Sequence, residues 1–345
     1  MAAPTTPLRR RAAALLLPAL LALGAGCARE PDVVLYCALD QVFSEELVRE
    51  FERETGLSVR AEFDVEAQKT VGLVARLREE RARPRCDVFW NNEVAHTVAL
   101  AEEGLFAAYD SPSAVDIPER WRDPARRWTG FAARARVFIV NTELADPAEI
   151  HGLDDLLDPR WAGRVCMARP LTGTTLTHVV ALFVGWGEER TRAWLERATA
   201  EGSPLSFVQS NGQVMRLVRE GQMAWGLTDT DDFRVAQAMG FPVAAVFPDQ
   251  GEGGEGTLLI PNTVAVLADA PHPEAARRLV DFLLSREVEA RLAASDSAQI
   301  PVREGVARPP HVPDAGALVV RDVDWAAVAR ELAPRTRELA ERFLR

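Results

Sequence analysis

The chain has 345 residues, with 40 lysines and arginines against 51 aspartates and glutamates, and a formal net charge of −11. This length exceeds what one compact core usually serves, so two lobes or two domains are expected. The acidic balance leaves no basic surface to neutralise phosphates, which argues against nucleic acid and anionic membrane surfaces as partners. The hydrophobic fraction of 48% is ordinary for a globular protein and argues against wholesale disorder.

The first 26 residues have the pattern of an export signal. Arginines at 9–11 precede an apolar run at 12–23, and small residues at 24–26 lead to Cys27. A positive start, a short apolar run and small residues at the cleavage site are typical of a signal peptide. The Cys after Ala-Gly resembles a bacterial lipobox, so we predict cleavage before Cys27 and a lipid anchor on its thiol, the only membrane contact expected. The alternative is plain secretion with Cys27 an ordinary residue.

Three further cysteines, Cys37, Cys86 and Cys166, are scattered without the spacing of a metal site. An odd number of cysteines cannot all pair, and we predict that these three are small buried hydrophobic residues. A disulfide between Cys37 and Cys86 in an oxidising compartment is the alternative.

In the first half of the chain, short apolar runs alternate with amphipathic stretches. The predicted elements are, in order, a strand at 33–37, a helix from 41 that stops at Gly56, a strand at 57–63, a helix around 71–77, a strand at 86–90 and a helix that ends at 104. This alternation predicts a parallel sheet covered by helices on both faces.

The second half begins with a long predicted strand at 128–142. Its Arg134 and Arg136 share one face, because alternate residues of a strand point to the same side. A second α/β series follows, with strands at 164–168, 205–208, 223–228, 243–247 and 257–267, and helices from 174, 188, 212 and 231, at 274–284, at 286–294 and at 325–344. Two α/β halves predict a hinged fold that closes about crossovers at 134–142 and 256–263.

Short polar side chains follow most of the predicted strands. Asp40 follows the first strand, and Asn92 and Glu93 follow the third. The second half supplies, in order, Thr172, Gly173, Thr174, Asn211, Asp229, Asp231 and Asp232. Ligands of open α/β sheets bind beyond the carboxyl ends of the strands, so these are the candidate ligand-binding residues. Helix capping is the alternative for each one singly, since short polar residues are favoured at N-caps.

Two of these groups suggest a chemistry. Residues 172–174 place a glycine and hydroxyls at a predicted helix N-terminus, where backbone N–H groups can hold an anion or carboxylate. They lack the Walker spacing and its lysine, which argues against a nucleotide. Asp229, Asp231 and Asp232 place three carboxylates within four residues, and such hard oxygen ligands suit Ca²⁺, Mg²⁺, Mn²⁺ or ferric iron. The aspartate run is not an EF-hand loop, because the required Gly and Glu are missing.

Signatures of enzymes are weak in the sequence. The histidines stand at 96, 151, 178, 272 and 311, without an H-E-x-x-H pair, and no G-x-S-x-G elbow occurs. No acid, base and nucleophile come together. We therefore predict that the chain is not an enzyme and has no cofactor, apart from a metal ion that it would carry as a transported ligand.

The chain contains, in order over residues 32–303, the segments VVLYCALDQVFSEELVREFERETGLSV, CDVFWNNE, RWTGFAARARVFIVNT, LLDPRWAGRV, RPLTGTT and IPNTVAVLADAPHPEAARRLVDFLLS. Together they resemble the extracellular solute-binding proteins of ABC transporters, specifically the ferric-iron-binding type. The resemblance implies the two-lobed type II periplasmic-binding-protein fold, in which each lobe is a mainly parallel sheet flanked by helices and a two-segment hinge joins the lobes. It also implies one ligand in the cleft and delivery to a membrane permease.

The metal ligands of that family carry over only in part. Its ferric members place a His after the first strand and a Glu after the third, where this chain has Asp40 and Asn92, with Glu93 beside it. They place a pair of tyrosines where this chain has Asp231 and Asp232. The resemblance thus implies a metal set of Asp40, Glu93, Asp231 and Asp232 without tyrosinate.

The anion-holding elements of the family match better. The loop at 172–174 matches the Ser/Thr-Gly loop of the family, and Asn211 matches an Asn. Arg134 and Arg136 match an Arg-x-Arg segment, while Asp229 takes the place of another Asn. The resemblance therefore implies that Arg134 can face a bound anion.

We predict a monomeric, lipid-anchored substrate-binding protein of an ABC importer in the periplasm or cell envelope. The predicted parts are a signal peptide at 1–26, the first part of lobe 1 at 27–135, lobe 2 at 136–256, and a return to lobe 1 with the C-terminal helices at 257–345. The first ligand hypothesis is ferric iron or another hard metal ion, with or without a small anion.

Several alternatives stay open. The second ligand hypothesis is an organic cation or zwitterion, such as a polyamine or an amino-phosphonate, whose ammonium faces the aspartates. Phosphate esters or phosphonates come third, because three aspartates repel them. A sensor domain or a periplasmic enzyme on the same fold ranks below these binding proteins.

Overall fold

The computed structural model describes residues 30–64 and 71–344. The predicted signal peptide at 1–26 and the predicted lipidation site Cys27 lie outside the described residues. Within the described ranges, no helix combines the length and the apolar character needed to cross a membrane.

The described part of the chain alternates strands and helices in the predicted order. The strands are β1 (Val33–Cys37), β2 (Val59–Phe63), β3 (Val88–Asn91), β4 (Thr129–Asn141), β5 (Val165–Ala168), β6 (Leu205–Val208), β7 (Trp225–Asp229), β8 (Val243–Val246) and β9 (Leu259–Val266). The helices are α1 (Gln41–Thr55), α2 (Val71–Glu79), α3 (Val94–Glu102), α4 (Gly173–Gly185), α5 (Glu188–Thr199), α6 (Asn211–Arg219), α7 (Thr230–Ala238), α8 (Pro273–Leu283), α9 (Arg286–Ala294) and α10 (Trp325–Phe343).

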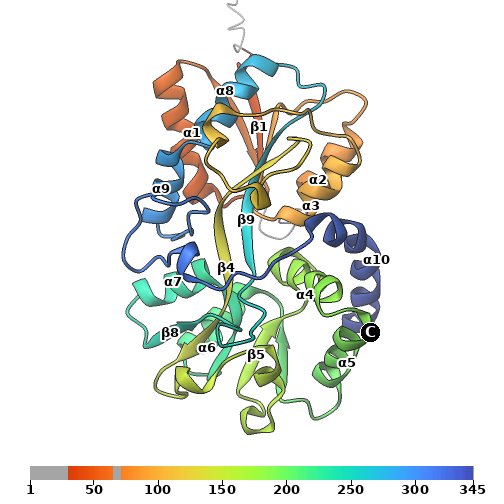
Figure 1. The fold of residues 1–345 in the computed structure, drawn as a ribbon, viewed down its shortest axis with the longest axis vertical. Helices are drawn as coiled ribbons and strands as arrows, with labels where there is room; N and C mark the ends of the chain where they lie inside the picture. Colours follow the sequence, from red (N-terminus) through yellow and green to blue (C-terminus); the bar gives the residue numbers. More distant parts are fainter. Residues whose placement is uncertain (1–29, 65–70, 345) are drawn as a thin grey trace, which may run out of the picture. The chain divides into compact units, whose positions relative to one another are not determined.

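The strands form a mixed sheet in the order β2-β1-β3-β9-β4-β7-β5-β6, and β8 pairs with β4. Strand β1 is parallel to β2 and β3, and β5 is parallel to β6 and β7. Strand β9 lies antiparallel between β3 and β4. The long strands β4 and β9 therefore run between two groups of parallel strands (Figure 1).

Strand β4 changes partner along its length. Thr129–Ala135 pairs with β9, and Arg136–Val140 pairs with β7. All thirteen of its residues are buried, so the two arginines in this apolar strand need partners inside the protein. The lobe boundaries proposed at 135/136 and 256/257 stay predictions.

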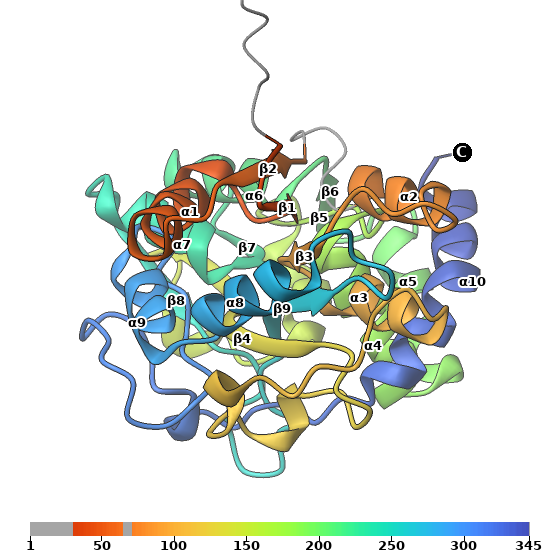
Figure 2. The ribbon, with the colours of Figure 1, turned by 90° about the horizontal axis from the view of Figure 1, so that it is seen from above.

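Helices cover both faces of the first group of strands, as predicted. Alternate residues of β1 enter different clusters: Val33 and Leu35 pack with α1, α8 and α9, whereas Val34 and Tyr36 pack with α2 and α3. Figure 2 shows α1 and α9 on one side of β1 and β3, with α2 and α3 on the other. This arrangement follows from the period of two in a strand that is buried on both faces.

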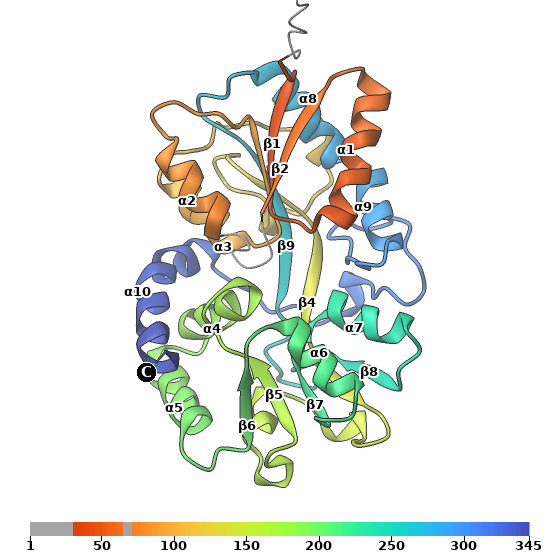
Figure 3. The ribbon, with the colours of Figure 1, turned by 180° about the vertical axis from the view of Figure 1, so that it is seen from behind.

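Helix α10 connects parts of the fold that are distant in sequence. It packs against α3 and against α4 (Figure 3). Its buried Val328, Leu332 and Leu339 belong to the same hydrophobic cluster as residues of both helices.

The three cysteines of the described residues are buried and free, and Cys86 belongs to this hydrophobic cluster. The prediction that Cys37, Cys86 and Cys166 are small buried hydrophobic residues is therefore confirmed.

Five helices begin directly after the carboxyl ends of strands, and these strands come from both groups of parallel strands. These are α1 after β1, α3 after β3, α4 after β5, α6 after β6 and α7 after β7. The N-terminus of a helix carries free N–H groups and a partial positive charge. The loops before these helices therefore bring hydrogen-bonding capacity from both groups of strands to one place, which is where the candidate site lies.

Candidate functional site

A polar cavity of about 340 Å³ lies among these five helix N-termini. All the residues predicted from the sequence as ligand-binding line it: Asp40, Asn92, Glu93, Arg134, Thr172, Gly173, Thr174, Asn211, Asp229, Asp231 and Asp232. The rule that ligands bind beyond the carboxyl ends of strands thus located the cavity correctly. Their role in binding a ligand stays a prediction.

The floor of the cavity is a buried ion pair between Arg136 and Asp229. The Nη1 atom of Arg136 donates to Oδ1 of Asp229 at 2.7 Å, and both side chains are almost completely buried. Oδ2 of Asp229 accepts from the Thr174 hydroxyl at 2.6 Å and from the Asn211 amide at 3.0 Å. Asp229 makes no capping bond to the helix α7 that it precedes, so capping does not explain this carboxylate.

Arg134 reaches across the cavity from the same face of β4. Its Nη2 donates to the backbone oxygen of Asn92 at 2.6 Å, and its Nη1 donates to Oδ2 of Asp231 at 3.3 Å. Its Nη1 also lies 3.9 Å from Asp229. The predicted common face of the two arginines is confirmed, because both contact Asp229.

The aspartates at the start of α7 form a compact group. Oxygens of Asp229, Asp231 and Asp232 lie within 4.8 Å of one another, close enough to hold one metal ion. Oδ2 of Asp232 accepts the Thr228 hydroxyl at 2.6 Å, and Oδ1 of Asp231 accepts the backbone N–H of Asp232 at 3.0 Å. Neither of the two later aspartates has a guanidinium as close as the one beside Asp229.

The three carboxyls titrate differently because their neighbours differ. Burial acts to raise the pKa of Asp229, but Arg136 and Arg134 outweigh it and lower this pKa below its ordinary value. Burial raises the pKa of Asp231. Arg134 lowers it in part, repulsion from Asp229 raises it again, and the net shift is upward. Burial followed by repulsion from Asp231 and Asp229 raises the pKa of Asp232 to about 7. Asp232 is thus the carboxyl that a cation would most strongly deprotonate.

The opposite wall comes from Asp40, Asn92 and Glu93. Both carboxylate oxygens of Glu93 accept backbone N–H groups of α3, from Ala95 at 2.6 Å and from His96 at 3.0 Å. Oε1 also accepts the hydroxyl of Thr177 on α4 at 2.7 Å, and Glu93 is only 1% exposed. Glu93 therefore caps α3 and ties it to α4, so its oxygens are already used.

The loop at 172–174 approaches the cavity with its backbone. Thr172 precedes α4 with an extended backbone and makes no side-chain cap. Gly173 has a φ of 59°, a conformation that favours glycine, although a Cβ there would meet nothing within 4 Å. The glycine is therefore required by the backbone turn, and the first N–H groups of α4 are left for a ligand or water.

Several further residues contribute to the cavity that the sequence reasoning did not select. Arg169, Thr175, Gln209, Ser210 and Gly212 line it, and Arg136 lies beneath it. Ser210 caps α6 through Gln213 N–H at 3.2 Å, so it is partly structural. The signal for Arg136 was its place in an apolar strand, where a charged residue requires a buried partner. The residues that line this cavity include no aromatic side chain.

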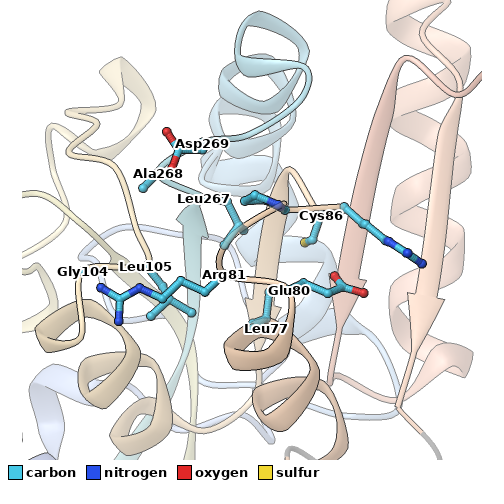
Figure 4. Close-up of a pocket in the computed structure, with 11 residues that line it drawn as sticks. Leu77, Glu80, Arg81, Cys86, Gly104, Leu105, Leu267, Ala268 and Asp269 are labelled. Carbon is cyan, nitrogen blue, oxygen red and sulfur yellow. The ribbon is translucent and has the colours of Figure 1, made fainter.

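A second, smaller cavity of about 170 Å³ lies at the other end of β3, between the end of α2 and the end of α3 (Figure 4). Its lining combines the aliphatic Leu77, Leu105 and Leu267 with the charged Glu80, Arg81 and Asp269. No group of metal-binding side chains gathers there among the described residues. The candidate site is therefore the polar cavity that Asp229, Asp231 and Asp232 line.

Comparisons with known proteins agree with this geometry. Iron uptake protein A1 of Synechocystis sp. is 27% identical over 321 residues, which cover 90% of this chain and 87% of that protein. A putative 2-aminoethylphosphonate-binding periplasmic protein of Salmonella typhi is 28% identical over 259 residues, covering 74% of this chain and 73% of that protein.

The crystal structure of iron-bound HitA from Pseudomonas aeruginosa aligns with a TM-score of 0.78 over 89% of this chain and 98% of that chain, at 24% identity. This likeness shows the two-lobed fold of periplasmic binding proteins, as the sequence resemblance implied. The model of a family described as bacterial extracellular solute-binding protein matches residues 46–319. The chain therefore belongs to the family of bacterial extracellular solute-binding proteins.

Proposed function

We propose that this chain is the substrate-binding component of an ABC importer, which captures a hard metal ion and delivers it to a membrane permease. The observation that carries the proposal is the group of Asp229, Asp231 and Asp232, whose oxygens lie within 4.8 Å of one another in a polar cavity. Hard cations prefer such oxygen ligands. Ferric iron is the first candidate, because a relative is an iron uptake protein and a structural neighbour is iron-bound.

In this proposal Asp231 and Asp232 are the main ligands, and Asp40 faces them from the other wall of the cavity. Glu93 ranks below them, since its two oxygens already hold α3 and Thr177. The loop at 172–174 and Asn211 complete the shell with neutral donors and acceptors.

Tyrosinate has no place in this site. Tyr36 donates its hydroxyl to Glu80, and Tyr109 donates to Asp281, and neither tyrosine lines the cavity. These are the chain's two tyrosines. Ferric iron bound here should therefore give no visible phenolate-to-iron absorption band, and an absorption spectrum of the iron-loaded protein would contradict the proposed ligands if it showed one.

A small organic cation or zwitterion is the second candidate ligand. Thr172 and Arg169 line the same cavity as the aspartates. An acid group of the ligand could therefore bind to Thr172 and Arg169, while its ammonium binds to the aspartates. A relative named as a putative 2-aminoethylphosphonate-binding protein agrees with this candidate.

The test is to identify the ligand and then remove one carboxylate. Native mass spectrometry of protein purified without chelator should show a bound metal ion, and calorimetry should then compare wild type with Asp232→Asn. Loss of one charged ligand should weaken metal binding by several kcal/mol. Asp324→Asn is the matched control, because Asp324 caps α10 outside the cavity and Asn caps a helix about equally well. Equal affinity of Asp232→Asn and wild type would refute the metal site.

We also propose that the protein acts in the periplasm or cell envelope, after removal of residues 1–26 and lipidation of Cys27. In this proposal it is a monomer whose lobes, 27–135 with 257–345 and 136–256, close on the ligand. Binding by such proteins is stoichiometric, so turnover of a bound ligand would instead indicate an enzyme.

A further inference from the structure

We propose that the carboxylate of Asp229 is a built-in counter-anion, which fills the position beside Arg136 so that a bound metal ion needs no accompanying anion there. The inference rests on the proposed function for the identity of the cavity as the ligand site. It deepens that function because it says whether the metal ion binds with or without an accompanying anion.

The first step is the convergence of donors on Asp229. A guanidinium from Arg136, a hydroxyl from Thr174 and an amide from Asn211 all donate to its two oxygens, at 2.7, 2.6 and 3.0 Å. A guanidinium with neutral hydroxyl and amide donors is a set that proteins use to recognise free carboxylates and phosphates. Here the protein itself supplies the anion that these donors hold.

The second step is the closure of the network around that carboxylate. Nη2 of Arg136 donates to the Thr175 hydroxyl at 3.2 Å, and this hydroxyl donates to the side-chain oxygen Oδ1 of Asn211 at 2.9 Å. Nη1 of Arg136 also donates to Thr174 at 3.1 Å. Arg136 and Asp229 are 0% and 3% exposed, so a ligand anion would have to displace Asp229 to reach the guanidinium.

The third step is the charge that remains at the surface of the cavity. Arg134, the second guanidinium, is 8% exposed and already contacts Asp231 at 3.3 Å and the Asn92 carbonyl at 2.6 Å. The arginines on β4 are therefore matched by Asp229 and Asp231, and Asp232 is a further carboxylate of the lining beside them. Arg169 also lines the cavity, directly after β5, so an acid group on a ligand would meet that guanidinium and not the position that Asp229 fills. The carboxylates at 231 and 232 attract a cation, while the anion position beside Arg136 is already occupied.

The test exploits the size of the missing group. Asp229→Ala removes a carboxyl and opens a space of the size of formate, between donors that stay in place. Asp229→Asn is the matched control, because its amide removes the charge but fills the space. Thermal melts of wild type and both variants, without metal, are recorded with sodium formate and with sodium chloride at equal ionic strength.

We expect Asp229→Ala to melt several degrees below wild type, since Arg136 loses its buried partner, and to regain most of that loss in formate. Wild type and Asp229→Asn should respond equally to the two salts. An Asp229→Ala protein that folds only in formate would also support the proposal. A folded Asp229→Ala protein with no specific response to formate would overturn it.

A second experiment measures the binding of Mn²⁺ alone by calorimetry. In wild type the affinity should change less than about twofold when formate, acetate or phosphate is added at constant ionic strength, because the anion position is already filled. In Asp229→Ala it should fall at least about tenfold, since the unpaired Arg136 repels the metal ion, and formate should restore it. An anion that tightens Mn²⁺ binding by wild type would overturn the proposal. If wild type binds no metal ion at all, the proposed function fails, while the melting experiment still decides the role of Asp229.

Discussion

Replacing Asp232 by asparagine should make the ligand-free protein more stable above neutral pH while weakening its hold on a cation. The carboxyl of Asp232 lies among other carboxyls, and burial together with repulsion from Asp231 and Asp229 raises its pKa from 3.8 to about 7. A raised pKa means that the folded state prefers the protonated form. Between about pH 4 and pH 7 the folded state then binds more protons than the unfolded state, so stability falls as pH rises through this window.

The size of the effect follows from the shift. One pKa unit corresponds to about 1.4 kcal/mol, so a shift from 3.8 to about 7 corresponds to roughly 4 kcal/mol above pH 7 as an upper limit. The neighbouring aspartates titrate together with Asp232, and we expect a net gain of about 1–3 kcal/mol for Asp232→Asn at pH 8. The asparagine oxygen can still accept the Thr228 hydroxyl, which Asp232 accepts at 2.6 Å, so no hydrogen bond need be lost.

The assay is urea unfolding of wild type and Asp232→Asn, free of metal and chelator, at several values between pH 4.5 and pH 8. The difference in unfolding free energy should be near zero at the acidic end and should grow in favour of the variant as pH rises. The order should reverse when a binding cation is added, because only wild type offers the extra charge. A variant that is no more stable than wild type at pH 8 would refute the reasoning.

Three further predictions concern other parts of the molecule. Thr177→Val removes the hydroxyl that donates to Glu93 at 2.7 Å, and it should lower the unfolding free energy by about 1–3 kcal/mol. Chemical denaturation measures this value, and an unchanged value would show that the hydrogen bond between α3 and α4 does not stabilise the fold. Burial, together with Arg136 and Arg321, lowers the pKa of His178 well below 6.5, so the stability of the protein should decline as pH falls below about 6.5. In thermal melts from pH 7 to pH 5, His178→Leu should reduce that decline. Intact-mass analysis of membrane-fraction protein should show diacylglyceryl mass on a chain that begins at Cys27, and an unmodified chain with another start would contradict the anchor.

Much of the site could be predicted from the sequence because its position follows from local patterns. An apolar run followed by a short polar residue and an amphipathic stretch marks the carboxyl end of a strand and the start of a helix. This pattern singled out Asp40, Asn92 and Asn211, and all three line the cavity. Asp40 and Asn92 meet because β1 and β3 are parallel neighbours. Asn211 follows β6 of the second group, whose carboxyl ends point toward the first group because β9 and β4 join the two groups through antiparallel pairs.

The partners of each charged group could not be predicted in the same way. In the sequence, the three carboxylates at 229–232 look equivalent. In the structure, Asp229 pairs with Arg136, 93 positions away, and Asp231 pairs with Arg134, 97 positions away. Glu93 resembles a ligand in the sequence, but it caps α3 and accepts a bond from Thr177, 84 positions away. Such pairings depend on contacts between elements that local propensity does not encode.

The amino-acid sequence by itself therefore determines the order of the elements, the apolar strands buried on both faces, and the set of polar residues at the carboxyl ends of the strands. The folded chain determines how charge is distributed among those residues. Strand β9 inserts antiparallel between β3 and β4, and β4 continues from β9 to β7, which brings Arg134 and Arg136 beneath the start of α7. The physical reason is that burial makes an unpaired charge costly, so the packing that buries an arginine also selects the carboxylate that neutralises it.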